Sequence, residues 1–150
     1  MAAPGRYGAL LLGLMLAGLA PAAVRADEPP RRVVSMNVCT DQLAMLVAGE
    51  GQLVSVSHLA SDPGTAVLAA EAGRYAVNHG LAEEVFLLRP DLVLAGTFTA
   101  QASVAMLRRL GFRVETFPPD ASFEDIVARI RRMGELLGRQ ARAEELVAEL

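Results

Sequence analysis

The side chains in this sequence best suited to nucleophilic or metal chemistry are Cys39, His58 and His79. A thiol can act as a nucleophile when an imidazole serves as its base, and two loop histidines can ligate a metal or an iron-bearing cofactor. The separation of the two histidines is not a recognised ligand spacing, however, and no acidic cluster accompanies them. We therefore predict no metal ligands. Two interpretations of the histidines stay open: hydrogen bonding in a ligand pocket, or ordinary loop positions.

The sequence carries none of the common catalytic or nucleotide-binding motifs. It contains no GxSxG, no P-loop and no HExxH, and its glycines at positions 49 and 51 lack the GxGxxG spacing. The single cysteine excludes an intrachain disulfide, and the missing CxxC argues against a redox enzyme. We predict that the protein is not an enzyme and that it has no catalytic residues.

Charge and aromatic content argue against a nucleic-acid partner. The 150 residues include 17 acids against 14 basic side chains, and aromatic residues make up only 5% of the chain. A net negative chain is repelled by a phosphate backbone, and few rings are present on which bases could stack. The adjacent acids Glu83 and Glu84 lie near the start of a predicted helix, where the helix dipole favours them. By themselves they indicate a solvated acidic face.

The N-terminus has the pattern of an export signal. Arg6 supplies a positive start, residues 8–20 form an apolar block, and Pro21 ends that block before Val24-Arg25-Ala26. The apolar block is shorter than the roughly 20 residues that a membrane-spanning helix needs, which disfavours a retained anchor. We predict a signal peptide at residues 1–26, cleavage after Ala26, and a periplasmic product.

Beyond the signal, strand and helix patterns alternate. Strands are predicted over residues 32–36, 53–57, 91–95 and 112–117. Helices are predicted over residues 42–48, 81–88, 101–110, 122–137 and 140–150, with residues 58–80 irregular apart from a possible helical turn or two at 66–72. Thr40 or Asp41 is expected to cap the first helix, and Ser122 with Asp125 resembles a capping box for the fourth.

This alternation predicts an α/β fold, a parallel sheet flanked by helices. Ligands of such sheets collect beyond the carboxyl ends of the strands. Those ends correspond here to loops that start at Asn37, His58, Gly96 and Pro118.

Three segments in order, residues 32–57, 79–96 and 106–117, resemble the N-terminal lobe of periplasmic substrate-binding proteins of iron–siderophore, haem and cobalamin ABC importers. The most specific piece is LLRPDLVLAG, a helix end joined through Pro90 to a buried strand. The resemblance implies a binding protein with two α/β lobes joined by a long helix and a ligand held in the cleft between them. It assigns residues 27–138 to the N-terminal lobe and residues 139–150 to the truncated start of the inter-lobe helix.

The resemblance also implies a ligand set and a docking residue. Its loops offer these ligand contacts: Asn37, Thr40, His58, Asn78, His79, Thr97 and Phe98. The acid matching the family's contact to the membrane permease is Glu83, with Glu84 as a one-residue alternative. The implied partners are the permease with its ATPase, and the implied ligand is a ferric siderophore, haem or cobalamin, with no resident cofactor.

The sequence departs from the family in ways that leave the ligand open. It lacks the aromatic residues that pack a corrin ring, because no Trp is present and only Tyr75 and Phe98 are near, and no cluster of Arg is evident in the loops. We expect weak ligand binding from a single lobe, and association through an apolar stripe of the last helix formed by Ala143, Leu146, Val147 and Leu150. The alternatives are an exported small α/β enzyme using Cys39 or the histidines, and a lone interaction or sensing lobe.

Overall fold

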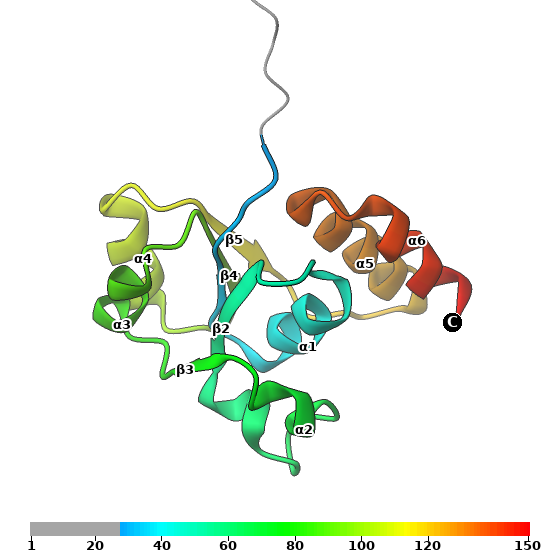
Figure 1. Ribbon diagram of the computed structural model, residues 1–150, viewed down its shortest axis with the longest axis horizontal. Helices are drawn as coiled ribbons and strands as arrows, with labels where there is room; N and C mark the ends of the chain where they lie inside the picture. The colour runs from blue at the N-terminus through cyan, green and yellow to red at the C-terminus, as the bar shows by residue number, and fades with distance from the viewer. Residues whose placement is uncertain (1–27) are drawn as a thin grey trace, which may run out of the picture.

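The computed structural model describes residues 28–150 as a five-stranded parallel sheet with helices on both faces (Figure 1). The predicted signal peptide and its cleavage site after Ala26 lie outside the described residues. The strands are β1 Val33–Ser35, β2 Leu53–Ser57, β3 Ala76–Asn78, β4 Leu92–Gly96 and β5 Val114–Phe117. Their order in the sheet is β3-β2-β1-β4-β5. The predicted fold class is confirmed.

Helices connect the strands and cover the sheet. They are α1 Val38–Val47, the 3-10 turn η1 His58–Ser61, α2 Ala69–Ala72, α3 Ala82–Leu88, α4 Gln101–Arg109, α5 Phe123–Leu137 and α6 Gln140–Ala148. Figure 1 shows α1 and α5 on one side of the sheet and α3 and α4 on the other. Within residues 28–150, no helix is long and apolar enough to cross a membrane.

The central strands are apolar on both faces because both faces are covered. Leu92 and Leu94 of β4 pack with α1 and α5, whereas Val93 between them packs with α3 and α4. All three side chains are fully buried. This explains why the apolar run at residues 91–95 reads as continuous instead of alternating.

The first helix and its cap differ from the prediction. The helix begins at Val38, and its N-cap is Asn37, whose Oδ1 accepts a hydrogen bond of 3.0 Å from the Cys39 N–H. Thr40 and Asp41, the predicted caps, lie inside the helix and are buried. Any of these three residue types can cap a helix, so position relative to the end of β1 decided which one does.

The segment 58–80, predicted to be largely irregular, contains β3. This strand has three residues, and Ala76 and Val77 are exposed because β3 lies at the edge of the sheet. A short edge strand carries no strong hydrophobic pattern, which is why the sequence did not reveal it.

The predicted cap of α5 is confirmed. Ser122 Oγ accepts a hydrogen bond of 3.1 Å from the Asp125 N–H, and Asp125 Oδ2 accepts one of 3.0 Å from the Ala121 N–H. The Ala121 N–H lowers the pKa of the Asp125 carboxyl. Along α5, Ile130, Met133 and Leu137 are buried and Ile126 is 38% exposed, whereas Leu110, the C-cap of α4, is 51% exposed.

The last helix, α6, packs against α5, so the apolar stripe predicted to be exposed is partly covered. Ala143 is buried against Gly134. A Cβ added at Gly134 would lie only 2.5 Å from the Cβ of Ala143. Leu146 packs against the main core, whereas Leu150 is 61% exposed. Most of the expected surface for association is therefore used inside the molecule.

Candidate functional site

All the loops that leave the carboxyl ends of the strands meet at one edge of the sheet, because the five strands are parallel. Asn37 follows β1, His58 follows β2, His79 follows β3, Thr97 follows β4 and Pro118 follows β5. The chain moves outward in opposite directions from the central pair β1 and β4. That pair is the topological switch point, where open α/β sheets bind ligands.

A pocket lies at this switch point, and we call it the switch-point pocket. Its lining residues are Asn37, Cys39, Thr40, Gly96, Thr97, Phe98, Phe117, Pro118, Pro119 and Arg129. The predicted ligand contacts Asn37, Thr40, Thr97 and Phe98 are among them. The structure therefore brings together residues that lie up to 61 positions apart in this predicted set.

Gly96 allows the two sides of the pocket to approach closely. A Cβ at Gly96 would lie 2.8 Å from Asn37 Nδ2. Thr97 Oγ1 donates a hydrogen bond of 3.2 Å to the Phe117 carbonyl, which ties the β4 loop to β5. Phe98 is 85% exposed and presents an aromatic ring at the rim.

Two predicted contacts, Thr40 and Asn78, are buried beneath the edge. Thr40 Oγ1 donates to the Asn37 carbonyl and shares a 2.7 Å hydrogen bond with Ser35 Oγ. The Asn78 amide donates to Ser35 O and to Ser55 Oγ, while its Oδ1 accepts from the Gly80 N–H. Asn78 is fully buried, so these bonds organise the loops and leave its side chain no exposed surface.

The two histidines form a pair at the ends of β2 and β3. Their rings are stacked with centroids 5.2 Å apart. Glu84 fixes His79, because its Oε1 lies 3.0 Å from Nδ1 and its Oε2 accepts a 2.6 Å hydrogen bond from the His79 N–H. This backbone hydrogen bond lowers the pKa of the Glu84 carboxyl. Neither histidine lines the switch-point pocket.

Asp41 is hydrogen-bonded to Ser57, the residue before His58, a contact that was not expected from the sequence. Its carboxylate accepts a 3.2 Å hydrogen bond from the Ser57 N–H and a 2.5 Å one from Ser57 Oγ. It therefore ties α1 to the residue just before His58. Burial raises the pKa of the Asp41 carboxyl. Interpreted from sequence as a cap, Asp41 gave no signal of this contact.

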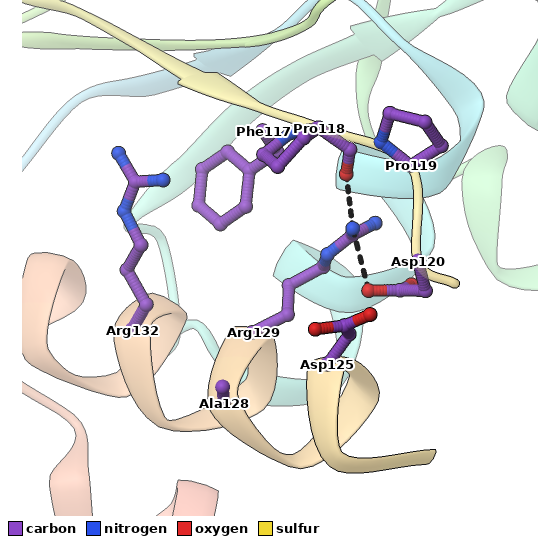
Figure 2. Close-up of a pocket in the computed structure, with 8 residues that line it drawn as sticks. All are labelled: Phe117, Pro118, Pro119, Asp120, Asp125, Ala128, Arg129 and Arg132. Atoms are coloured by element: carbon purple, nitrogen blue, oxygen red, sulfur yellow. Dashed lines mark hydrogen bonds and ion pairs between the residues drawn. The ribbon is translucent and has the colours of Figure 1, made fainter. Parts of the chain in front are cut away.

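A second pocket, which we call the Arg129 pocket, lies between the end of β5 and α5 (Figure 2). It has a volume of about 230 Å³ and is lined by Phe117, Pro118, Pro119, Asp120, Asp125, Ala128, Arg129 and Arg132. Arg129 donates to the Pro118 carbonyl and forms an ion pair with Asp120 at 2.5 Å. The Arg132 guanidinium lies 4.6 Å from the centroid of the Phe117 ring and also bonds Glu115.

No cluster of Arg was evident in the loops, and these two arginines reach the pocket from a helix instead. Arg129 and Arg132 lie one turn apart on α5, the i, i+3 spacing that places side chains on one face. Arg129 lines the switch-point pocket as well as its own.

The two candidate docking acids have different surroundings. Glu84 is engaged with His79, whereas Glu83 is exposed and makes none of the hydrogen bonds or ion pairs found among residues 28–150. Glu83 borders an apolar groove between α3 and α4, which is lined by Ala82, Phe86, Leu87, Met106 and Leu110. Of these two candidates, Glu83 is the one whose carboxylate makes no hydrogen bond or ion pair within residues 28–150.

The carboxyl edge presents groups that can bind a ligand. In the described part of the chain, no group of three His, Cys, Asp or Glu side chains is placed to hold a metal ion. The hydrogen bonds among residues 28–150 include none between Cys39 and either histidine. The two pockets, which share lining residues, present the Phe98 ring, amide and hydroxyl groups, and the guanidinium groups of Arg129 and Arg132.

Comparison with known proteins gives a consistent result. A family model described as "Periplasmic binding protein" matches residues 33–150. A cobalamin-binding protein of Halobacterium salinarum is 29% identical over 128 residues, which are 85% of this chain and 35% of that protein. The uncharacterized ABC transporter substrate-binding lipoprotein YvrC of Bacillus subtilis is 26% identical over 130 residues, 85% of this chain and 40% of that protein.

Solved structures show the same fold. A periplasmic haem-binding protein from Pseudomonas aeruginosa superposes with a TM-score of 0.63 at 25% identity, covering 77% of this chain and 41% of that one. The periplasmic vitamin B12 binding protein BtuF of Vibrio cholerae gives a TM-score of 0.66 at 21% identity, covering 81% and 47%. The chain spans less than half the length of each of these relatives and structures.

Proposed function

The chain belongs to the periplasmic binding protein family, and from this membership we propose that it is the substrate-binding component of an ABC importer for an iron complex or cobalamin. The family is one of binding proteins and not of enzymes. The relatives it matches include proteins named for cobalamin binding and for ABC transport. Export to the periplasm, with residues 1–26 removed as a signal peptide, is part of the proposal.

One observation carries this proposal: two pockets that share lining residues lie at and beside the topological switch point, on the carboxyl edge of the sheet. Asn37, Thr97 and Phe98 come from the two central loops and line the switch-point pocket. Both pockets lie on a single lobe, which fits a ligand that a second surface covers. We propose that the ligand lies over this edge, with the histidine pair at its β2–β3 end.

Direct titration tests ligand binding. Isothermal titration with haem, a hydroxamate siderophore, a catecholate siderophore and cobalamin should show saturable binding of one of the four. Thr97→Ala and Phe98→Ala should weaken that binding. Val67→Ala, which removes a side chain 94% exposed and remote from both pockets, serves as the control. No binding of any of the four compounds would contradict the proposed function.

Glu83 is the residue we propose to dock on the permease. Complementary charge steers and registers a carrier on its transporter without demanding high affinity. Glu83→Arg should impair uptake in a transport assay while ligand affinity is unchanged, and Glu50→Arg, an exposed acid in the turn before β2, should leave uptake intact. Weaker ligand binding with normal uptake would refute the docking role.

A specific observation argues against the alternative of a thiol or imidazole enzyme. His58 stacks on His79, and His79 contacts Glu84. Cys39 instead lines the switch-point pocket, which neither histidine lines. A nucleophile needs its base within hydrogen-bond reach. Among residues 28–150, no hydrogen bond joins Cys39 to either histidine.

A further inference from the structure

We propose that Arg129 receives a carboxylate group of the bound ligand, and that Asp120 occupies this position until the ligand replaces it. The inference rests on the proposed function only in taking the ligand to be a transported iron or cobalt complex. It adds that this ligand bears a carboxylate group. Neither Arg129 nor Asp120 was among the ligand contacts that the sequence predicted.

The position of Arg129 is the first argument. Arg129 lines both pockets, which also share Phe117, Pro118 and Pro119. Figure 2 shows the side chain reaching from α5 toward the Pro118–Asp120 loop at the end of β5. A ligand seated over the switch point would therefore meet this group at its β5 end.

The unused bonding capacity of Arg129 is the second argument. Both of its contacts, to Pro118 O and to Asp120 Oδ1, are made by Nη2. No hydrogen bond among residues 28–150 uses Nε or Nη1, although the side chain is only 12% exposed. A guanidinium presents five N–H donors in a planar fork that matches a carboxylate. The present contacts leave most of that fork available.

The two acids of the pocket differ in how firmly they are held, which is the third argument. Asp125 caps α5 and accepts a hydrogen bond from the Ala121 N–H. Asp120 lies in the irregular loop that joins β5 to α5, and Arg129 is its one ion-pair partner among the described residues. Asp120 is therefore the carboxylate that can leave.

Charge balance favours this exchange, in which Asp120 turns toward solvent. The pocket lining contains two guanidinium groups and two carboxylates, so its formal charges cancel. A ligand carboxylate that simply added to the pocket would place a third negative charge beside Asp120 and Asp125. Replacing Asp120 on Arg129 keeps the balance and forms a charge-assisted pair in a partly buried setting.

A purely structural ion pair would behave differently, and this difference makes the inference testable. If the pair only closes the loop onto α5, then removing either charge weakens the site in the same direction. If Asp120 competes with the ligand, the two substitutions change ligand affinity in opposite directions. Arg129→Gln should then lower affinity and Asp120→Asn should raise it.

The experiment is isothermal titration of the purified protein with citrate, ferric citrate, haem, haem dimethyl ester and inorganic phosphate. We expect binding of at least one free carboxylate compound, reduced about tenfold or more by Arg129→Gln and increased several-fold by Asp120→Asn. Haem dimethyl ester, whose carboxylates are blocked, should not respond to either change. Arg131→Gln and Glu144→Gln, which break an exposed ion pair between α5 and α6, are the matched controls.

Each outcome bears on the inference. Loss of affinity in both variants while circular dichroism shows both folded would overturn it in favour of a structural pair, and so would no change in either variant. Phosphate binding with the same dependence would overturn the carboxylate assignment, as would failure of all five compounds to bind. If Arg129→Gln does not fold, the sign of the Asp120→Asn effect alone decides. Opposite changes with citrate, but no binding of any metal complex, would support the inference and contradict the proposed function.

Discussion

The two halves of the carboxyl edge use their polar side chains in different ways. After β2 and β3 lies what we call the bonded half, formed by Asp41, Ser57, His58, Asn78, His79 and Glu84. After β1, β4 and β5 lies the open half, formed by Asn37, Gly96, Thr97, Phe98, Pro118 and Arg129. The polar side chains of the bonded half are engaged with partners inside the protein, whereas the residues of the open half line the two pockets.

The difference separates positioning from recognition. A buried polar group whose partners are all within the protein adds rigidity but has nothing left to offer a ligand. A group such as the Arg129 guanidinium, partly buried and with donors still unused, can recognise one. Preorganised sites need both kinds, because a supporting shell must fix the loops that carry the contacts.

The largest effect on stability should come from Asn78 in the bonded half. Asn78→Ala leaves Ser35 O, Ser55 Oγ and the Gly80 N–H without their partner inside the protein, so we expect the free energy of unfolding to fall by about 3 kcal/mol. Urea denaturation measures it. Thr97→Ala, which removes one side-chain hydrogen bond in the open half, should cost about 1 kcal/mol or less. Equal decreases in the free energy of unfolding for the two variants would contradict the difference proposed between the bonded half and the open half.

Gly96 tests the open half. In Gly96→Ala the new Cβ would meet Asn37 Nδ2 at 2.8 Å and displace the side chain that caps α1. Since loss of an N-cap costs about 1 kcal/mol, we expect a decrease of that size in the free energy of unfolding. Gly73→Ala is the control, because its helical backbone and open surroundings accept a Cβ. A stability of Gly96→Ala equal to wild type would show that Asn37 is free to move.

Asp41 should give the bonded half a pH dependence. Its pKa is raised by burial in the folded state, so the folded protein binds this proton more tightly than the unfolded chain does. Stability from this group is therefore greatest at low pH and decreases as pH rises from 3.8, the ordinary value, to the higher folded pKa.

Asp41→Asn should remove that part of the slope. Chemical denaturation of both proteins at a series of pH values measures the difference between them, which isolates Asp41 from the acids whose pKa is lowered. An unchanged slope would mean that Asp41 does not titrate in this range.

The smallest effect on stability should come from Glu84, whose carboxylate is at the surface. Glu84→Gln should leave the free energy of unfolding nearly unchanged, because exposed ion pairs contribute little. It should instead alter the tautomer of His79, since the carboxylate accepts at Nδ1 in the present structure. Nitrogen-15 NMR of the imidazole reads this directly. An identical tautomer in the variant would show that Glu84 does not orient the ring.

Local patterns predicted most of the fold. The strands β1 and β4 are mainly apolar, β2 and β5 alternate in part with polar residues, and α5 was marked by a capping box. These signals are local because burial on a sheet or a helix face imposes a period on neighbouring residues. The edge strand β3 and the Asn37 cap were missed, because neither leaves such a period.

The site could be predicted only in part. Asn37, Thr97 and Phe98, which the family resemblance implied as ligand contacts, follow predicted strands and line the switch-point pocket. Asn78 was in the predicted set but is buried, and Arg129 was absent from the set although it lines both pockets. Sequence position gives the edge on which a residue lies and not the direction in which its side chain points.

The sequence by itself thus determined the alternation of strands and helices, the parallel sheet and the edge at which the carboxyl ends of its strands meet, because hydrophobic burial is encoded in neighbouring residues. Only the tertiary structure decided which polar groups bond to other groups of the protein and which keep donors or acceptors available for a ligand. Asp41 meets Ser57, and Arg129 meets Asp120, across turns and layers that no local period describes. Hydrogen bonds and ion pairs depend on distances of a few ångströms between separate elements, and packing alone sets those distances.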